Sequence, residues 1–468
     1  MGLGRLFPMR TERDSMGDMT LPEGALYGAS TQRAVLNFPI SGHRLPGAFL
    51  RGLGLVKFAC AEANAALGLL PQEKARLICA AAREIADGRL LEHFPVDVFQ
   101  TGSGTSTNMN ANEVIANRAS QLAGEPIGSR RPVHPNDDVN LSQSSNDIIP
   151  TVLHLSVARA LRDRLRPALV GLEAALAERS AAFAGIVKIG RTHLMDATPL
   201  TLGQEFSGYA AQIAKAVARC DRAGSLLEEL AVGGTAVGTG LNCPPGFAAA
   251  VCAILSRETG IAFREAGNHF EAQAARDDVV EVAGLLAATA GALSKIAGDV
   301  RLLGSGPRSG LGELRLPATQ PGSSIMPGKV NPVMCEMVVQ VGHYVQGLVT
   351  TVQLAGRDGQ LELNVTLPLL AYSLHEAVGC LAQAAHRFAE ACVAGLEADP
   401  ARCRELTDRS LMLVTALNPI LGYDRAAEVA KEAHATGRTL REVVLARGWM
   451  TADEVDRVLD PRGMTGPR

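Results

Sequence analysis

The middle of the chain contains long stretches in which apolar residues recur with the period of a helix. Residues 151–184, 199–230, 271–303 and 332–354 are rich in Ala and Leu and poor in Gly and Pro. Such spacing places apolar side chains on one face of an amphipathic helix. A 30-residue helix is about 45 Å long at about 1.5 Å per residue. We therefore predict an elongated helical bundle whose apolar, small-residue surfaces pack against other copies of the chain.

The two flanking regions have shorter elements. Before residue 140 the pattern predicts helices at about 48–70 and 72–92 among turns and short segments. After Asp399-Pro400 it predicts a compact helical piece. Thr198-Pro199 and Asn331-Pro332 each match a helix start, with an N-cap residue followed by Pro at the first helical position. The chain is therefore predicted to be mainly α-helical.

The composition of the chain argues against several classes of function. Of the 468 residues, 47% are hydrophobic but only 4% are aromatic, which suits close helix packing. The net charge is −3 and no basic run carries interleaved aromatics, so nucleic acid is not an expected partner. Nine scattered cysteines without a C-x-x-C pair indicate reduced thiols. We expect no membrane span and no targeting signal within Met1 to Arg10, and therefore a cytoplasmic protein.

Four segments interrupt the apolar helices with small polar residues, Gly and side-chain amides. They are residues 101–110, 134–147, 190–196 and 322–331. A single segment of this kind is most simply an ordinary turn, but four at the junctions of long helices indicate a binding site. Ser, Thr and Asn donate neutral hydrogen bonds, and backbone N–H groups at Gly-rich turns attract anions. Lys329 adds a point charge in a chain that has few lysines, so the segments predict a site for an anionic dicarboxylate.

Candidate reactive groups lie in two of these segments. Ser323 becomes a usable base only where donors and a positive charge stabilise its alkoxide, and the flanking glycines and Lys329 could provide both. His193 needs little tuning to transfer protons near neutral pH, and a carboxylate such as Glu336 would orient it. His134 is a weaker candidate, and the other histidines are interpreted as surface or core residues.

Other kinds of site are disfavoured. The sequence has no His-Glu-x-x-His motif and no Cys/His pair at metal-ligand spacing, so no metal is expected. The segment Gly233–Gly240 lacks the Gly-Lys-Ser/Thr ending of a nucleotide-binding loop. We interpret this segment as a tight turn between two helices.

The loop Gly-Ser-Ser-Ile-Met-Pro-Gly-Lys-Val-Asn at 322–331 makes the chain resemble the fumarase/aspartase superfamily, and most closely the class II fumarate hydratases. The similarity extends from the Arg-Asp-Ser-Met-Gly segment at 13–17 to the Gly-Tyr-Asp-Arg-Ala-Ala segment at 422–427. The resemblance implies a mainly α, three-domain fold, with domains at 1–140, 141–397 and 398–468. It also implies a central bundle of five long helices, which four subunits assemble into a 20-helix tetramer core. Each active site would draw on three subunits and use no cofactor.

The resemblance also implies roles for individual residues in the interconversion of fumarate and (S)-malate. Ser323 would be the base that takes the C3 proton of malate, giving an aci-carboxylate intermediate. His193, paired with Glu336, would act through a water molecule on the hydroxyl side. The residues that match substrate-binding positions are Ser103, Gly104, Thr105, Ser144, Ser145, Asn146, Thr192, Ser324, Lys329 and Asn331. A second, outer anion site matches His134, Pro135, Asn136 and Asp137.

Two alternatives stay open at the level of sequence. Aspartate ammonia-lyases share the 322–331 loop but usually carry Gly-Gly-Ala-Gly at 101–104, Ala at 328 and Pro at 335, where this chain has Thr-Gly-Ser-Gly, Gly328 and Cys335. Argininosuccinate and adenylosuccinate lyases match only the signature loop. A catalytically silent homologue is the other alternative, although none of the key residues is missing. Leu141 departs from the Lys or Met of many relatives, which bears on the outer site.

Overall fold

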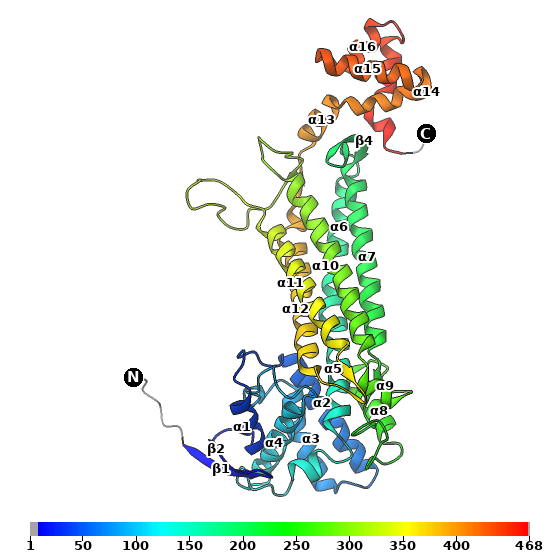
Figure 1. Cartoon of the computed structure of the whole chain (residues 1–468). Helices are drawn as coiled ribbons and strands as arrows, with labels where there is room; N and C mark the ends of the chain where they lie inside the picture. Colours follow the sequence, from blue (N-terminus) through cyan, green and yellow to red (C-terminus); the bar gives the residue numbers. More distant parts are fainter. Residues whose placement is uncertain (1–7, 467–468) are drawn as a thin grey trace. The chain divides into compact units, whose positions relative to one another are not determined.

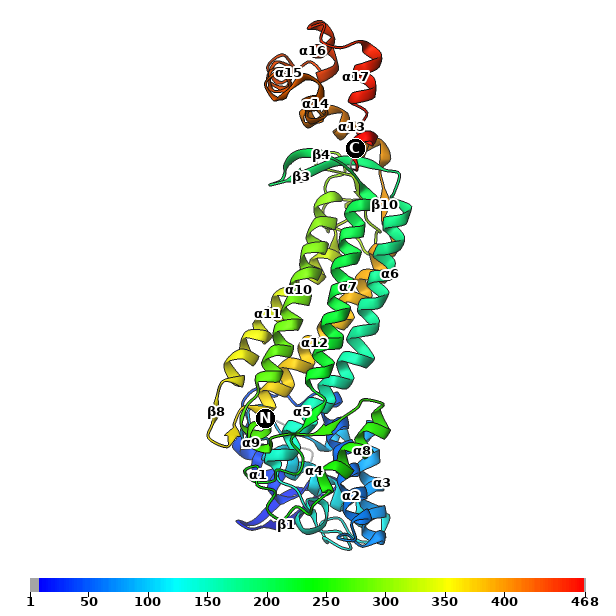
Figure 2. The same ribbon diagram turned by 90° about the vertical axis from the view of Figure 1, so that its right-hand side faces the viewer.

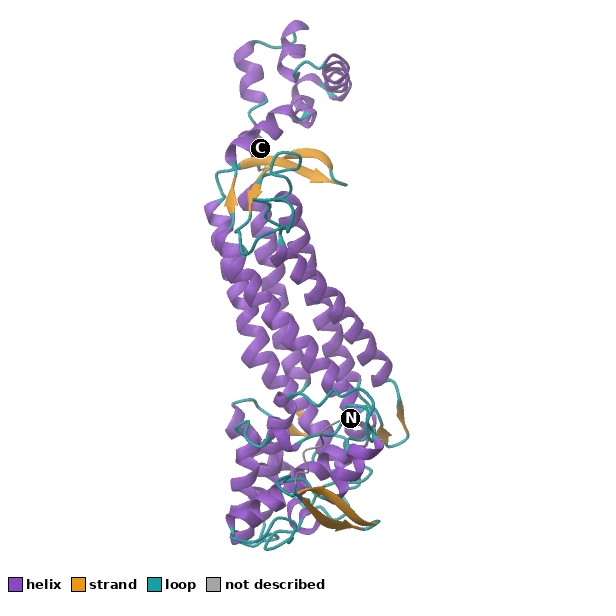
Figure 3. Cartoon of the chain, turned by 90° about the vertical axis from the view of Figure 1, so that its left-hand side faces the viewer, coloured by secondary structure: helices purple, strands orange, loops and turns teal. Residues whose placement is uncertain are grey.

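The computed structural model describes residues 8–466 of the chain, and helices dominate it (Figure 1 and Figure 3). The expectation that the N-terminus carries no targeting signal falls largely on residues outside this range. Strands occur as short ribbons of two, all antiparallel except the parallel pair of β5 with β6. The prediction of a mainly α-helical chain is confirmed.

The elements have the following bounds. The helices before the long central ones are α1 Ala29–Asn37, α2 Gly47–Ala66, α3 Gln72–Ala86, α4 Thr105–Leu122 and α5 Ser145–Ala160. The central helices are α6 Arg166–Ala182, α7 Leu202–Leu226, α8 Phe247–Thr259, α9 His269–Ala274, α10 Asp277–Leu303, α11 Val333–Gly356 and α12 Leu367–Ala391. The C-terminal helices are α13 Pro400–Arg409, α14 Asn418–Leu421, α15 Tyr423–Thr436, α16 Leu440–Ala446 and α17 Ala452–Val458. The strands are β1 Met9–Asp14, β2 Gly17–Pro22, β3 Val187–Thr192, β4 Met195–Thr201, β5 Glu229–Leu230, β6 Arg264–Glu265, β7 Leu314–Arg315, β8 Gly359–Gln360, β9 Leu363–Asn364 and β10 Glu397–Ala398.

The chain divides into two compact units, each built from several stretches of sequence. Unit 1 comprises residues up to Pro167 together with Ala218–Ala290 and His343–Ala382. Unit 2 comprises Ala168–Val217, Gly291–Gly342 and the chain from Gln383 onward. In each unit the segments of the long helices that belong to it lie alongside one another (Figure 2). The three-domain division implied by the resemblance stays a prediction.

Unit 1 is organised around α2, which packs against α3, α5 and α8. The buried face of α2 includes Phe49, Leu53, Val56 and Cys60, which recur at helical spacing. α4 packs against α3 and α5. The helices at the start of unit 1 therefore share one apolar core, and α4 and α5 carry two of the polar segments at their N-termini.

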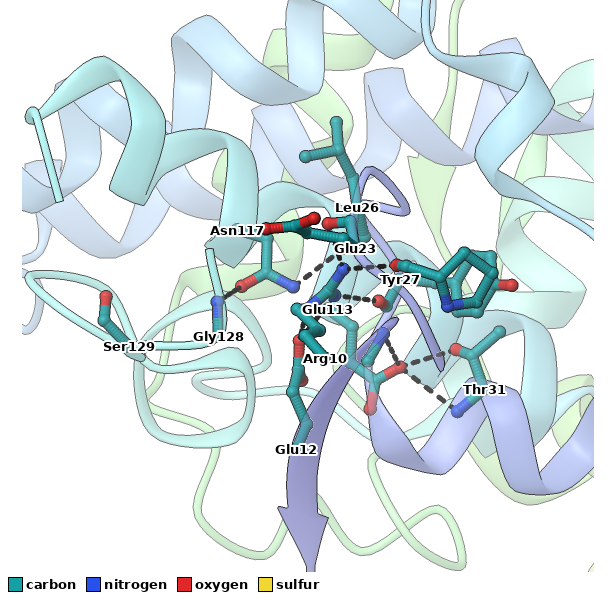
Figure 4. A network of polar contacts seen from close by, with 12 residues as sticks. Arg10, Glu12, Glu23, Leu26, Tyr27, Thr31, Glu113, Asn117, Gly128 and Ser129 are labelled. Atoms are coloured by element: carbon teal, nitrogen blue, oxygen red, sulfur yellow. Dashed lines mark hydrogen bonds and ion pairs between the residues drawn. The ribbon is translucent and has the colours of Figure 1, made fainter. Parts of the chain in front are cut away.

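A polar network fixes the N-terminal ribbon and α1 to α4 (Figure 4). The buried carboxylate of Glu113 accepts hydrogen bonds from the backbone N–H groups of Gly28, Ser30 and Thr31 and from the Thr31 hydroxyl. Asn117, one turn later on α4, donates to the carbonyl of Leu26 at 2.8 Å. Burial raises the pKa of Glu113, and the four donors oppose that shift. These contacts hold α4 in place, and α4 begins at a candidate binding turn.

Unit 2 contains the antiparallel ribbon of β3 and β4 and a separate C-terminal helical core. β3 packs against α13. Ten buried residues form the C-terminal core, among them Leu417, Val443 and Val455. This core confirms the compact helical piece predicted after residue 399.

Two local predictions are corrected by the structure. Thr198-Pro199 does not begin a helix, because both residues lie in β4. The helix α7 begins at Leu202, where Thr201 and Gln204 form a reciprocal pair: Gln204 N–H donates to Thr201 Oγ1 and Thr201 N–H donates to Gln204 Oε1. The predicted helix at 151–184 begins six residues earlier and passes through a π-helical turn at Leu161–Leu165 before continuing as α6.

By length and composition alone, α10 is the one helix in the described part of the chain that could cross a membrane. Half of its apolar window is buried inside the chain. A helix buried in a protein core meets the same criterion of length and composition. α10 therefore does not change the expectation that the chain has no membrane span.

Candidate active site

The first polar segment forms the turn that begins α4. Gly104 is the residue before the helix and has a φ of 73°, in the left-handed region that favours glycine. A Cβ at this position would lie 2.8 Å from a methyl carbon of Ile149 on α5. Ser103 and Thr105 hydrogen-bond through their hydroxyls at 2.8 Å. Gly104 therefore allows the N-terminus of α4 to approach α5 closely, with two hydroxyls at the turn.

The second polar segment ends at the N-terminus of α5. Ser144 caps the helix: its hydroxyl accepts from Asn146 N–H at 3.3 Å, and its own N–H donates to Asp147 at 2.9 Å. Ser145 is buried, and its hydroxyl accepts a 3.3 Å hydrogen bond from the side chain of Asn108 on α4. This contact brings the first and second predicted segments together within unit 1.

A loop that the sequence analysis did not assign to the site also meets α5. Asp147 accepts hydrogen bonds from Gly233 N–H and Thr235 N–H, both at 3.0 Å. Asn146 donates to the carbonyl of Ala236 at 2.8 Å. The interpretation of this glycine-rich segment as a tight turn between two helices is wrong, because β5 and a longer loop separate α7 from α8. The buried N–H groups of Gly233 and Thr235 and the carbonyl of Ala236 instead bind the start of α5.

The segment proposed as an outer anion site is a single π-helical turn at Pro135–Val139. His134 Nδ1 accepts hydrogen bonds from Asn136 N–H and Asp137 N–H at 3.3 and 3.1 Å. The imidazole thus caps two backbone donors of the turn, and the same Nδ1 lies 3.3 Å from an oxygen of the Asp137 carboxylate. Pro135 is buried, whereas Asn136 and Asp137 are exposed.

The third polar segment forms the tip of the β3–β4 hairpin in unit 2. Thr192 pairs with Met195, so His193 and Leu194 are the two residues of the turn. Their φ values are 58° and 62°. Such a two-residue turn usually contains Asn and Gly, and a bulkier residue in the left-handed region costs roughly 1–2 kcal/mol. Both residues and Thr192 are exposed, so the turn presents the imidazole at the surface of unit 2.

A buried charge cluster supports the base of this hairpin. Arg191 binds the carboxylate of Glu313 through two hydrogen bonds of 3.0 and 2.9 Å. Lys188 lies 3.0 Å from Glu205 and 3.4 Å from Glu313. The Glu313 side chain is fully buried and that of Lys188 is 2% exposed. Two cations of β3 are therefore held on one buried carboxylate, which fixes the strand that leads to His193.

The fourth segment, the 322–331 loop, is closed on itself by its own backbone. Gly322 N–H donates to the Lys329 carbonyl at 2.8 Å, and the Asn331 side chain donates to the Gly322 carbonyl. A Cβ at Gly322 would lie 2.3 Å from the Lys329 carbonyl oxygen, so the closure requires glycine. The Ser323 hydroxyl oxygen accepts hydrogen bonds from Ile325 N–H at 3.2 Å and Met326 N–H at 3.0 Å. Ser324 and Lys329 are exposed.

Glu336 lies in the first turn of α11, immediately after the loop, and its N–H bonds the Pro332 carbonyl. The start of α11 next to Asn331-Pro332 agrees with the prediction of a helix beginning there. Among residues 8–466, no hydrogen bond or ion pair joins Glu336 to His193 within one chain. The pairing of these two residues therefore stays a prediction.

Two other histidines are buried and hydrogen-bonded inside the protein core. His154 is buried and hydrogen-bonds the Glu229 carbonyl, and burial lowers its pKa to about 3. His375 is buried against the Ser156 hydroxyl, with its pKa lowered to about 4 by the same cause. Both fit the interpretation of these histidines as core residues. All nine cysteines are free thiols, as expected. The group that sequence reasoning missed is Lys57, a fully buried lysine that binds the segment leading to α5.

Comparison with known proteins identifies the chain. A family model described as lyase matches residues 17–347, and one described as the fumarase C C-terminus matches residues 413–466. The chain is 54% identical to fumarate hydratase class II 2 of Bradyrhizobium diazoefficiens, over 98% of this chain and 97% of the relative. It belongs to the class II fumarate hydratase family. The family resemblance predicted from the sequence is thus confirmed, and with it the prediction of a lyase.

Two further relatives agree with this assignment. Fumarate hydratase class II of Rhizobium meliloti is 53% identical, over 98% of this chain and 99% of the relative. The crystal structure of recombinant class II fumarase from Schistosoma mansoni superposes with a TM-score of 0.96 at 39% identity, covering 98% of this chain and all of that one. The fumarase/aspartase-like fold predicted from the sequence is confirmed by this structural match.

Proposed function

We propose that the chain catalyses the reversible anti addition of water to fumarate, giving (S)-malate. Membership in the class II fumarate hydratase family supports the reaction class and the substrate. In unit 1, the adjoining N-termini of α4 and α5 supply several hydroxyl and N–H donors. Such donors suit the carboxylates of a dianionic substrate.

The observation that carries the mechanism is the surroundings of Ser323. Its hydroxyl oxygen accepts two backbone N–H hydrogen bonds, from Ile325 and Met326. Backbone N–H groups are suitable donors to an alkoxide at Ser323. They stabilise its negative charge without giving up their own protons to it. In the direction of dehydration, Ser323 takes the C3 proton of malate. The resulting aci-carboxylate carries an extra negative charge, which Lys329, Asn331 and neighbouring donors stabilise.

The second half of the reaction is assigned to His193 and Glu336. Acting through a water molecule, His193 gives a proton to the C2 hydroxyl, which leaves as water while the double bond forms. Hydration reverses each step, so that His193 takes a proton from the attacking water and Ser323 returns its proton to C3. Glu336 orients the imidazole and stabilises its charged form.

The complete site is proposed to form in a homotetramer, with residues from three subunits in each active site. Exposed apolar side chains surround the candidate groups of unit 2: Leu194 is 75% exposed, Met195 69% and Ile325 83%. Apolar side chains grouped beside reactive residues suit surfaces that another copy covers. This assembly would bring His193 of one chain to Glu336 of another. The cytoplasm is the proposed location, and His134 to Asp137 are proposed as an outer anion site.

A direct assay tests the activity. Purified protein is mixed with fumarate, with and without ammonium, and the loss of double-bond absorbance is followed while (S)-malate is assayed separately. The proposal predicts equal consumption in both mixtures and one malate for each fumarate consumed. Consumption that depends on ammonium would support the ammonia-lyase alternative, which the hydratase relatives do not favour. A stable tetramer that consumes no fumarate in either mixture would support the silent homologue.

A further inference from the structure

Lys57 is a buried cation beside the candidate binding turn of α5. It lies on α2, and its side chain has no exposure to solvent. Its ammonium group donates to Gln143 Oε1 at 2.8 Å and to Asn140 Oδ1 at 3.1 Å. Both acceptors are neutral amides. In the described residues Lys57 forms no ion pair, which is unusual because removing a charge from water costs several kcal/mol unless an opposite charge offsets it.

A short relay of hydrogen bonds joins Lys57 to Ser145. Asn140 Oδ1, which accepts from Lys57, also accepts from the side chain of Asn108 at 3.0 Å. The second hydrogen of that Asn108 amide points to Ser145 Oγ at 3.3 Å. Because the Ser145 oxygen accepts from Asn108, its own hydrogen is free to donate elsewhere. The relay therefore presents Ser145 as a donor, which is the role that a substrate carboxylate needs.

The carboxylate of Asp147 explains why a cation is needed at this place. Asp147 is fully buried in the first turn of α5, two residues after Ser145. Its oxygens accept from Ser144, Gly233 and Thr235, and it interacts electrostatically with Lys57. A buried negative charge so close to the binding turn would repel an anionic substrate. Burial raises the pKa of Asp147, and its backbone donors and the positive charge of Lys57 oppose that shift.

We propose that Lys57 is a positioning residue for substrate binding: it offsets the charge of Asp147 and, through Asn140 and Asn108, orients Ser145 toward a substrate carboxylate. This inference rests on the proposed function of Ser145. It assigns no step of the reaction to Lys57. It therefore predicts that loss of the ammonium weakens the binding of fumarate and (S)-malate and leaves the chemical step nearly unchanged.

The test compares Lys57→Met with Lys74→Met in the full-length protein. Lys74 is a matched control, because its charge is already paired with Asp138 at 2.9 Å and its side chain is 35% exposed. Lys57→Met should raise the KM for fumarate and for malate about tenfold or more, with kcat within about threefold of wild type. Lys74→Met should change neither value by more than about twofold.

Two further variants separate the electrostatic role from a purely structural one. Asn140→Asp keeps the shape of the turn and places a carboxylate beside Lys57, so it should also raise KM even if Lys57→Met folds poorly. Adding Asp147→Asn to Lys57→Met removes the uncompensated negative charge and should recover part of the lost affinity. A merely structural lysine would give a larger loss in the double variant.

The outcomes distinguish this inference from the proposed function. Turnover of fumarate by the wild-type protein tests the proposed function. The ratio of the KM of the variant to the KM of the wild type tests the role of Lys57. If wild-type protein does not turn over fumarate, the same ratio is measured on the dissociation constant of fumarate by calorimetry. Wild-type affinity in folded Lys57→Met and Asn140→Asp proteins, or a loss confined to kcat, overturns the inference.

Discussion

In unit 1, Ser103 and Ser145 are more than nine-tenths buried and each is bonded to a neighbouring side chain, whereas in unit 2 Thr192, His193, Ser324 and Lys329 are exposed. The first set is proposed to bind carboxylates and the second includes groups proposed to bind substrate and react with it. Ser103 is held by the hydroxyl of Thr105, and Ser145 is held by the side chain of Asn108. The segments that carry the exposed groups are held by other contacts: the backbone hydrogen bond of the 322–331 loop, and Glu313, which binds Arg191 in β3.

This difference suggests that substrate binding and the chemical step depend on different units. Unit 1 holds the groups proposed to bind the substrate carboxylates, so changes there should act mainly on KM. Unit 2 holds the groups proposed to react, Ser323 and His193, so changes to these two residues or to their supports should act on kcat or on stability. The predictions below test this separation.

The largest expected effect is on Ser323. Replacing Ser323 with Ala removes the base and should lower kcat by roughly a thousandfold, within the usual range for a general base. KM should change little, because the hydroxyl is assigned to the chemical step. Steady-state kinetics gives both values, and analytical ultracentrifugation checks that the assembly is intact.

Ser324→Ala is the neighbouring comparison. This serine is assigned to carboxylate binding, so its removal should raise KM more than it lowers kcat. The same pattern in both variants, or near-normal kcat in Ser323→Ala, would remove the distinction between the two serines and the assignment of the base.

The second prediction concerns the support of the hairpin. Glu313→Ala leaves Lys188 and Arg191 buried without their shared carboxylate. Breaking a buried pair in this way costs about 3–5 kcal/mol, so the melting temperature should fall clearly. Because Arg191 is two residues from His193, kcat should fall as well, with KM much less affected. Thermal unfolding and kinetics measure the two effects.

Glu313→Gln is the milder variant, since it keeps the shape and one acceptor oxygen for the two cations. It should recover part of the lost stability and of kcat together. If stability falls and kcat does not, the cluster supports the fold of unit 2 without positioning His193.

The sequence pattern located the four polar segments because small polar residues and glycines are conspicuous among apolar helices, and their role as one binding site stays a prediction. It missed Lys57, because the residues beside it on α2 are apolar and its polar partners lie 83 and 86 positions away. It misplaced the start of α7, because Thr-Pro is a dipeptide that commonly begins a helix and nothing in the two residues themselves shows that they lie in a strand. Only the pairing of β4 with β3 shows that these residues are extended. Local patterns therefore located the segments, whereas their supports depend on contacts distant in sequence.

The third prediction is a dependence of affinity on pH. Burial lowers the pKa of Lys57 to about 8, opposed by the negative charge of Asp147 and by the nearby Cys60. The ammonium is present below that pH and is lost above it, and an anionic substrate favours the protonated form. KM for fumarate should therefore rise by up to about tenfold as the pH increases through about 8. The Lys57→Met protein, which lacks the titrating group, should show no such step, and an identical step in both proteins would assign it to another residue.

The smallest expected effect is at Leu141, the position where the family resemblance implies Lys or Met. The network of unit 1 uses the backbone of this residue, since its carbonyl accepts from Asn64 and from Gln143 at 3.0 Å. A new side chain leaves both hydrogen bonds possible. Leu141→Lys should therefore keep kcat and KM within about twofold of wild type, because it leaves this backbone network in place. A much larger fall in KM would mean that a charge at this position reaches the substrate, and the outer segment would then belong to the same anion site as α4 and α5.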